Sequence, residues 1–208
     1  MNKQRKSSTN KWKRLFYSLL ILNIAGIIII IALVFWPVPE KEIISSNHMK
    51  TIDSSEFVVR TTKKNLNELV NAYIEKLTQG TKHQYSISLE DDVHLLGELP
   101  VFSTTVPLSV HLVPFVQDNG DVILKQKSIS IGLLELPNKK IMEYMAKFLP
   151  MPDWVTINAK EEEIYVAVSE MDIKSNFKVG VEHFDLGANN LAFRINIPYK
   201  TLGIELIE

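Results

Sequence analysis

The sequence predicts an α+β protein with an N-terminal transmembrane helix and an extracytoplasmic domain. We expect that domain to contain a long, curled antiparallel sheet and two main helices. Three observations lead to this prediction. Residues 15–36 contain no charged side chain. Strand-like runs later in the chain are not regularly interleaved with helices, which favours an antiparallel sheet. Asn119-Gly120 stands between two long alternating runs and is a strong hairpin signal.

Residues 15–36 are predicted to span the membrane as an uncleaved anchor. A helix of about 20 apolar residues crosses the hydrocarbon core, and this run has 22. The alternative, a cleaved signal peptide, ends in small residues, whereas this run ends in "VFW" and is followed by "PVP". Six basic and no acidic residues precede it, so the positive-inside rule places residues 1–14 in the cytoplasm. We therefore expect a single-pass protein of the cell membrane whose C-terminal domain is extracytoplasmic.

The sequence divides into four parts by composition. These are a basic cytoplasmic tail, the transmembrane anchor, a polar linker with two prolines, and the extracytoplasmic domain, at residues 1–14, 15–36, 37–55 and 56–208. Residues 37–208 carry 17 basic and 24 acidic side chains. A net-acidic domain argues against nucleic-acid binding, which depends on phosphate neutralisation by Lys and Arg. The chain has no cysteine, which excludes disulfides and thiolate metal sites.

Two segments of the domain have helical periodicity. In residues 61–77, apolar side chains recur at the spacing of one face of an amphipathic helix. Thr61 or Thr62 is a suitable N-cap, and Gly80 follows the end. Residues 139–149 form the second helix, opened by Pro137 and Asn138.

The remaining segments alternate like strands. A short strand, "EFVVR", enters the first helix, and "YSISLE" pairs with "VHLLGEL" across a turn at Asp91-Asp92. Residues 101–116 pair with residues 122–136 across Asn119-Gly120. Two further hairpins follow, "WVTIN" with "EIYVAVSEM" and "NFKVGVEHFDL" with "NLAFRINIPY".

The long hairpin has a predicted register. A two-residue type I′ turn at Asn119-Gly120 makes facing residue numbers sum to 239. The facing pairs on the apolar side include Val106 with Leu133, Leu108 with Ile131, Val110 with Ile129, and Leu112 with Lys127. His111 faces Ser128 on the opposite, small and weakly polar side, where we interpret it as a solvated strand residue. Pro107 and Pro114 cannot donate to a ladder, so this strand is expected at an edge or bulged. A strand this long must curl, and curled sheets cover helices or enclose an apolar groove.

Signatures of catalysis and cofactor binding are absent from the sequence. It contains no HExxH zinc motif, no GxSxG nucleophile elbow and no glycine-rich phosphate loop. We therefore assign no catalytic residue, no metal ligand and no cofactor, and do not expect an enzyme.

The ordered motifs resemble those of one family. The basic tail and anchor are followed by "FVVRTTKKNLNELVNAYI", "LPVFSTTVPLSVHLVPFVQDNGDVILKQKSISIGLLELP", "MPDWVTI" and "IYVAV". This pattern resembles the YpmS-like family of single-span membrane proteins from low-GC Gram-positive bacteria, over nearly the full chain. The resemblance transfers no catalytic residue and implies lipid or envelope work. By analogy, the curled sheet and helices also look like tubular lipid-binding modules.

These observations favour a binding protein. The first hypothesis is that the sheet and helices form an apolar groove for a lipid or a lipid-linked envelope component. The candidate lining residues are Val106, Leu108, Val110, Ile129, Ile131 and Trp154. The alternative is a scaffold that recruits an envelope enzyme through an edge strand or its acidic surface.

Overall fold

The computed structural model describes residues 9–34, 54–101, 104–132, 137–171, 173 and 176–203. They form two compact units, Met1–Pro39 and Glu40–Glu208, described here separately. The first contains helix α1 (Thr9–Val34). The elements of the second are β1 (Ser54–Thr61), α2 (Lys63–Thr78), β2 (Tyr85–Leu89), β3 (Val93–Val101), β4 (Thr104–Val116), β5 (Val122–Ile131), α3 (Asn138–Phe148), β6 (Val155–Asn158), β7 (Glu163–Val166), η1 (Val168–Glu170), β8 (Lys178–Asp185), β9 (Asn190–Pro198) and η2 (Tyr199–Leu202).

Helix α1 is the one helix among the described residues that is long and apolar enough to cross a membrane. Within it, the 18-residue span Trp12–Ile29 has a mean hydropathy of 1.5. Asn23, a polar residue within this window, donates its side-chain N–H to the carbonyl of Leu19 at 3.3 Å. This bond reduces the cost of placing an amide in hydrocarbon. Most of the predicted basic tail and linker lies outside the described residues, and β1 begins at Ser54, two residues before the predicted domain boundary.

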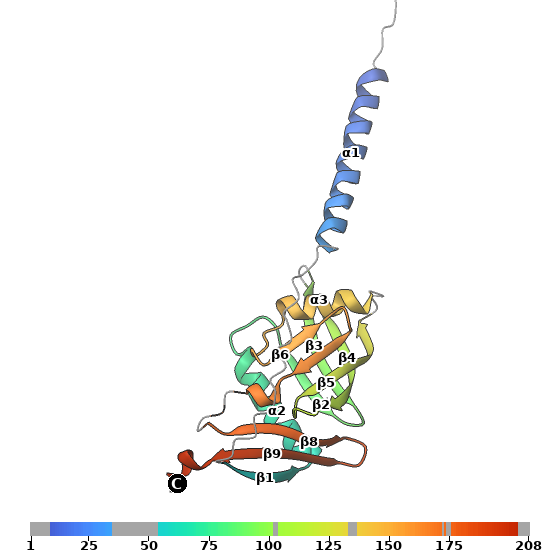
Figure 1. Ribbon diagram of the computed structural model, residues 1–208. Coiled ribbons are helices and arrows are strands. Elements are labelled where there is room, and N and C mark those ends of the chain that lie inside the picture. Colours follow the sequence, from blue (N-terminus) through green and yellow to red (C-terminus); the bar gives the residue numbers. More distant parts are fainter. Residues whose placement is uncertain are drawn as a thin grey trace, which may run out of the picture. The chain divides into compact units, whose positions relative to one another are not determined.

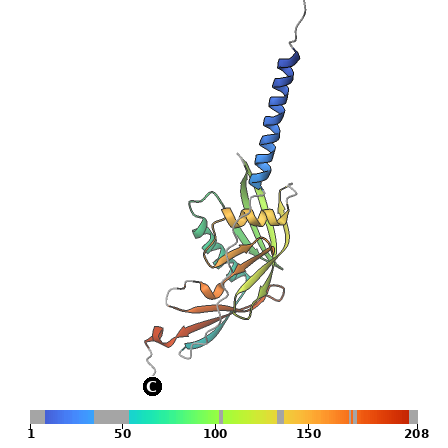
Figure 2. The ribbon, with the colours of Figure 1, turned by 45° about the horizontal axis from the view of Figure 1, so that its top comes forward.

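The α+β prediction is confirmed, but the strands form two sheets rather than one. The larger sheet has six strands in the order β2-β3-β4-β5-β7-β6, and the smaller has the order β1-β9-β8. All pairings are antiparallel. Figure 1 shows the smaller sheet below the larger one, and Figure 2 shows how strongly the strands of the larger sheet twist. The pairing of β1 with β9 joins distant parts of the chain, and no local pattern predicts it.

Helix α2 forms where the periodicity predicts, and Thr62 is its N-cap. The Thr62 hydroxyl accepts the backbone N–H of Asn65 at 3.2 Å. Two asparagines of α2 bond to the outer edge of β2. Asn71 accepts from Ile87 N–H at 2.9 Å and donates to its carbonyl at 2.6 Å, and Asn67 accepts from Leu89 N–H at 3.2 Å. The helix therefore occupies an edge that would otherwise be open to pairing.

The turn of the long hairpin differs from the prediction. Gln117 N–H donates to the Asp121 carbonyl at 2.8 Å, and Gly120 N–H donates to the Gln117 carbonyl at 2.9 Å. Gly120 has a φ of +86°, whereas Asn119 is not among the residues with positive φ. The loop is therefore a three-residue turn ending in a left-handed glycine, not a type I′ turn. Beside it the register moves by one, and Leu112 faces Gln126 instead of Lys127.

A β-bulge then restores the predicted register. His111 faces Ser128 while Leu112 faces Gln126, which leaves Lys127 unpaired in the ladder. Beyond the bulge, Leu108 faces Ile131 and Val110 faces Ile129 as predicted. The predicted partner of Val106, Leu133, lies outside the described residues. The bulge removes the Lys127 ammonium from the apolar face, where the simple register would have placed it beside Leu112.

The proline-bearing strand β4 is neither an edge strand nor bulged at its prolines, which corrects the sequence expectation. It lies between β3 and β5. Pro107 sits opposite the end of β5, where its carbonyl accepts Gly132 N–H at 2.9 Å. Pro114 lies beyond the end of the β3 pairing at Leu112. The N–H that Pro107 lacks would point past the end of β5, and the one that Pro114 lacks would point past the end of β3. Neither proline removes a hydrogen bond from the sheet, so a central strand tolerates both.

The tip of the β4–β5 hairpin joins the two sheets. The Gly120 carbonyl accepts Val181 N–H from β8 at 2.7 Å, and a Cβ on Gly120 would lie 2.9 Å from the Cα of Gly180. Asp121 is fully buried beside this contact. Its carboxylate accepts bonds from three donors: the Tyr165 hydroxyl, the Asn119 amide at 2.7 Å and the backbone N–H of Ser169 at 2.9 Å. We call the group formed by Asn119, Gly120, Asp121, Tyr165, Ser169 and Val181 the sheet joint.

The sheet joint also explains an error in the predicted strand at 163–171. Strand β7 ends at Val166, and a 3₁₀ turn, η1, follows. That turn points the N–H of Ser169 at Asp121. A buried carboxylate is costly without such donors, so the chain turns at Val168 instead of continuing the strand over residues 167–171.

Candidate functional site: an apolar cavity

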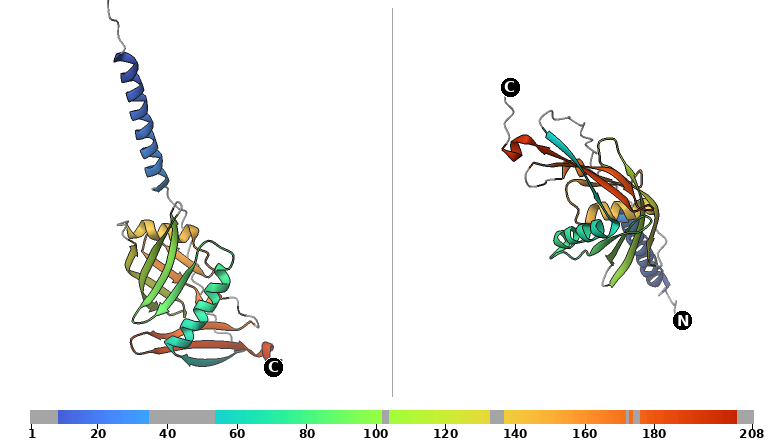
Figure 3. Two further views of the ribbon diagram at one scale, coloured as in Figure 1. Left: turned by 180° about the vertical axis from the view of Figure 1, so that it is seen from behind. Right: turned by 90° about the horizontal axis from the view of Figure 1, so that it is seen from below.

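A cavity of about 630 Å³ lies inside the second unit. Its walls come from the inner face of the larger sheet, from α2, from the smaller sheet and from the segment around β6 and η1. Figure 3 shows α2 running beside the larger sheet toward the smaller one. No described residue of α3 belongs to the lining; the buried side chains of that helix pack in the core with Leu108 and Val110 instead.

The cavity lining is almost wholly apolar. It includes Leu66, Val70, Ile74 and Leu77 from α2, Val93, Leu95, Leu112 and Leu124 from the larger sheet, and Val179, Val181, Phe193 and Ile195 from the smaller sheet. No Asp, Glu, Lys, Arg or His belongs to the lining formed by the described residues. Such a surface offers hydrophobic contact and almost no polar recognition.

Exposed apolar side chains mark the mouth of the cavity. Leu69 and Tyr73 stand one turn apart on α2 and are 68% and 42% exposed. Val59 of β1, also in the lining, is 46% exposed. The Tyr73 ring lies 5.8 Å from that of Trp154, centroid to centroid. The mouth is therefore lined by exposed apolar side chains of α2 and β1, with an aromatic pair beside it.

The phenol of Tyr85 is a polar group in the wall, and it stays neutral. Its hydroxyl donates to the Pro150 carbonyl at 2.7 Å. Burial, together with the nearby Tyr73, raises the pKa of Tyr85 to about 12. The hydroxyl therefore remains protonated throughout the physiological range, and the cavity gains no charge from it.

The six sequence-predicted lining residues lie in two different places. Leu108, Val110 and Ile131 are at most 4% exposed and belong to the packed core that includes α3, with Val106 and Ile129 packed against it. Trp154 lines the cavity. The apolar face of the hairpin is thus core near α3, and its continuation toward the turn, through Leu112 and Leu124, faces the cavity.

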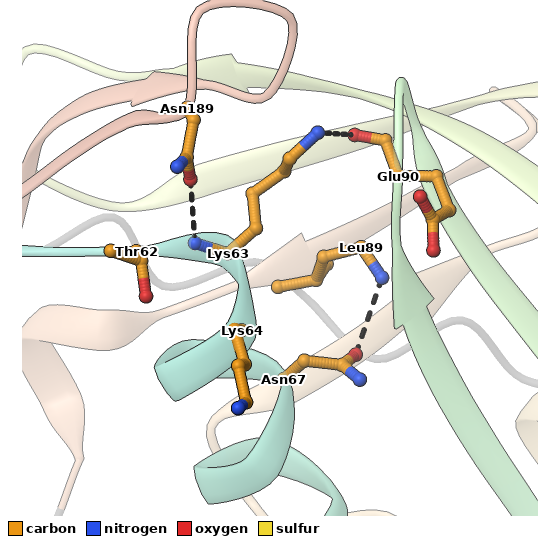
Figure 4. A pocket seen from close by; sticks show the side chains of 7 residues that line it. All are labelled: Thr62, Lys63, Lys64, Asn67, Leu89, Glu90 and Asn189. Carbon is orange, nitrogen blue, oxygen red and sulfur yellow. Dashed lines mark hydrogen bonds between the residues drawn. The ribbon is translucent and has the colours of Figure 1, made fainter.

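A smaller, polar pocket of about 390 Å³ adjoins the start of α2. Figure 4 shows Lys63 bridging two turns. Its backbone N–H donates to Asn189 at 2.8 Å, and its ammonium donates to the Glu90 carbonyl at 2.9 Å. These bonds fix the helix start against β2 and the β8–β9 turn, so we interpret the pocket as structural.

Two stacked histidines stand on the other side of the larger sheet. The rings of His94 and His111 are 3.9 Å apart and inclined by 16°. His111 bonds Asp92 at 3.0 Å, Lys127 bonds the same carboxylate at 3.0 Å, and His94 bonds the Ser109 hydroxyl at 2.8 Å. His111 is therefore not simply a solvated strand residue, and Asp92 is buried rather than an exposed turn residue. The bulge at Lys127 brings its ammonium to this cluster.

The histidine cluster makes stability fall in acid. Burial and the neighbouring His111 lower the pKa of His94, although Asp92 opposes this. Because the unfolded chain then binds more protons than the folded one, stability declines as pH falls below about 6.5. Burial alone would raise the pKa of Asp92, but the bonds from His111 and Lys127 lower it, so its contribution is lost only at more acid pH.

We expect the substitution His94→Gln to flatten this dependence. The amide keeps a partner for Ser109 but cannot gain a proton. Thermal unfolding midpoints measured between about pH 7 and pH 5 should fall less steeply for this variant. The same substitution at the exposed His183 is the control. An unchanged slope in His94→Gln would contradict this reading.

No group of three or more His, Asp or Glu side chains is placed to hold a metal ion within the described residues. The clearest feature of the structure is instead the combination of a long apolar helix with an α+β domain that encloses an apolar cavity.

Comparisons with known proteins identify the family of this chain. A family model described as "Uncharacterized protein conserved in bacteria (DUF2140)" matches residues 10–197, and the chain belongs to this family. The "Uncharacterized protein YpmS" of Bacillus subtilis (strain 168) is 32% identical over 191 residues, which cover 91% of this chain and 98% of the relative. The resemblance to a YpmS-like family is therefore confirmed. No solved structure matches the chain.

Proposed function

We propose that this protein is a membrane-anchored binding protein whose extracytoplasmic domain takes the acyl chain of a lipid or lipid-linked envelope component into the cavity. The observation that carries the proposal is the 630 Å³ apolar cavity with an exposed apolar mouth. Its volume falls within the range of about 300–1,000 Å³ that is usual for ligand sites.

The lining suits a hydrocarbon chain and not a head group. Each methylene that leaves water for an apolar site contributes about 0.8 kcal/mol, whereas a charge buried without a partner costs far more. The described lining supplies no charged partner. The polar head of the ligand therefore stays at the mouth, beside Tyr73 and Trp154.

The anchor would hold the proposed binding site close to the membrane. The basic residues before α1 favour a cytoplasmic N-terminus and an extracytoplasmic domain. A domain tethered to the outer face of the membrane meets its lipids at a high effective concentration.

A binding role fits the lining better than catalysis does. Acid–base or nucleophilic catalysis needs a positioned His, carboxylate, Lys or activated hydroxyl near the substrate. The Ser109–His94 pair lies on the opposite face of the sheet from the cavity, and Asp92 bonds His111 rather than His94.

Energy transfer from Trp154 tests the proposal. A fragment of residues 54–208 holds both hydrophobic clusters and Trp154 as its single tryptophan. Parinaric acid, a conjugated fatty acid that absorbs tryptophan emission, should quench Trp154 saturably at near-equimolar ratio. An excess of palmitate should restore the emission.

Quenching no stronger than that of free N-acetyltryptophanamide would reject acyl binding. If such a fragment formed reproducible crosslinks to an envelope enzyme instead, the scaffold alternative would be favoured.

A further inference from the structure

Strand β1 is the edge where this domain is most open to pairing. Both sheets are open, so they have four edge strands: β2, β6, β8 and β1. The edge of β2 is bonded by asparagines of α2. Strand β6 has only four residues and packs beside α3. Strand β8 is bulged at Val181/His183 and bonded to Gly120.

The outer edge of β1 has none of these protections within the part of the chain that the structure describes. It is eight residues long, contains no proline and pairs only with β9. Phe57, Val58 and Val59 are 51%, 50% and 46% exposed. An apolar, unbulged edge of this length is a ready template for another strand.

The sequence of β1 is complementary to itself. A two-fold axis normal to the sheet pairs each residue with one on the same face, so facing numbers sum to an even value. If Val58 lies on the axis, Glu56 faces Arg60 and Phe57 faces Val59 of the other copy, each pair occurring twice. Placing residue 57 or 59 on the axis leaves both charges without an opposite partner.

Glu56 and Arg60 are also available for this pairing. Both are exposed, and neither bonds or forms an ion pair with any described side chain. We therefore propose that two copies of this chain associate by antiparallel pairing of their β1 strands about Val58, which makes one continuous six-stranded sheet from the two smaller sheets. This inference does not depend on lipid binding.

Cysteine crosslinking of the full chain in membranes tests the proposed dimer. The natural chain has no cysteine, so Val58→Cys introduces a single thiol that lies against its own copy on the axis. Mild oxidation should convert most of this variant to a disulfide-linked dimer. Leu202→Cys, at a position that is 54% exposed near the C-terminal end of the domain, measures random collision and should crosslink far less.

Charge exchange tests the register. In the Val58→Cys chain, Glu56→Arg places like charges opposite each other twice and should lower the crosslinked fraction about fivefold or more. Adding Arg60→Glu restores opposite pairs and should restore the dimer. Both positions are exposed, and an unchanged thermal midpoint will show that the domain remains folded.

Crosslinking of the Val58→Cys chain that is no greater than that of the Leu202→Cys chain would overturn the proposal. The proposal would also be overturned if Glu56→Arg left the crosslinked fraction of the Val58→Cys chain unchanged, or if that chain formed disulfides only with a different protein.

Discussion

Replacing Asp121 by alanine is expected to cost about 3–4 kcal/mol of the free energy of unfolding. The carboxylate is fully buried and accepts bonds from Tyr165, Asn119 and the N–H of Ser169. Alanine leaves all three donors without this acceptor, at about 1–3 kcal/mol for each buried group that stays unsatisfied. For a domain of this size, the thermal midpoint should fall by roughly 10 °C.

Two further variants identify the cause of this loss. Asp118→Ala removes an exposed carboxylate from the same turn and should change stability by less than about 0.5 kcal/mol. Asp121→Asn keeps the shape but turns one acceptor into a donor, so it should be nearly as damaging as alanine. Thermal and denaturant unfolding of residues 54–208 measure all three. Equal stability of Asp118→Ala and Asp121→Ala would show that the buried carboxylate does not stabilise the sheet joint.

Local pattern predicted much of this fold because most elements are set by short-range periodicity. The stripe of α2 and its Thr62 cap appear as expected, as does the central register through Leu108 and Ile131. That register agrees with the prediction because two differences cancel. The three-residue turn shifts the register by one residue, and the bulge at Lys127 shifts it back. Neither is encoded by alternation alone, because both depend on where the Lys127 ammonium and the hairpin tip find partners.

Long-range pairings account for what the sequence could not show. The strand order cannot be inferred from "EFVVR" and "NLAFRINIPY" separately, yet their pairing creates the second sheet. Proline placement gave a misleading edge prediction, because Pro107 and Pro114 each fall at the end of a neighbouring strand.

The sequence predicts an apolar groove, but it does not predict which residues line it. A long apolar hairpin face must be buried by other elements, but the sequence alone does not show which part of that face α3 packs against. Leu108 and Val110 therefore lie in packed core, while Trp154 and the stripe of α2 line the cavity. The sequence shows the apolar stripe of α2, but the exposure of Leu69 and Tyr73, which an ordinary core helix would bury, is visible only in the structure.

Substituting Val70 by tryptophan is expected to remove bound lipid without unfolding the domain. Val70 lines the cavity from α2, so an indole there fills apolar space that an acyl chain would otherwise occupy. A large residue in a full core costs about 1–3 kcal/mol, but here the cavity offers room, and the thermal midpoint should stay equal or rise. Ala72→Trp, on the exposed side of the same helix, is the matched control.

The most direct measurement is the amount of lipid that accompanies each variant. The full chain is released from membranes, its domain is cleaved from the anchor, and the bound lipid is extracted and quantified by mass spectrometry per mole of protein. We expect near-stoichiometric acyl lipid on the natural sequence and Ala72→Trp, and at least about tenfold less on Val70→Trp. Lipid content that is negligible in the natural sequence, or equal in folded Val70→Trp, would contradict an acyl-binding cavity.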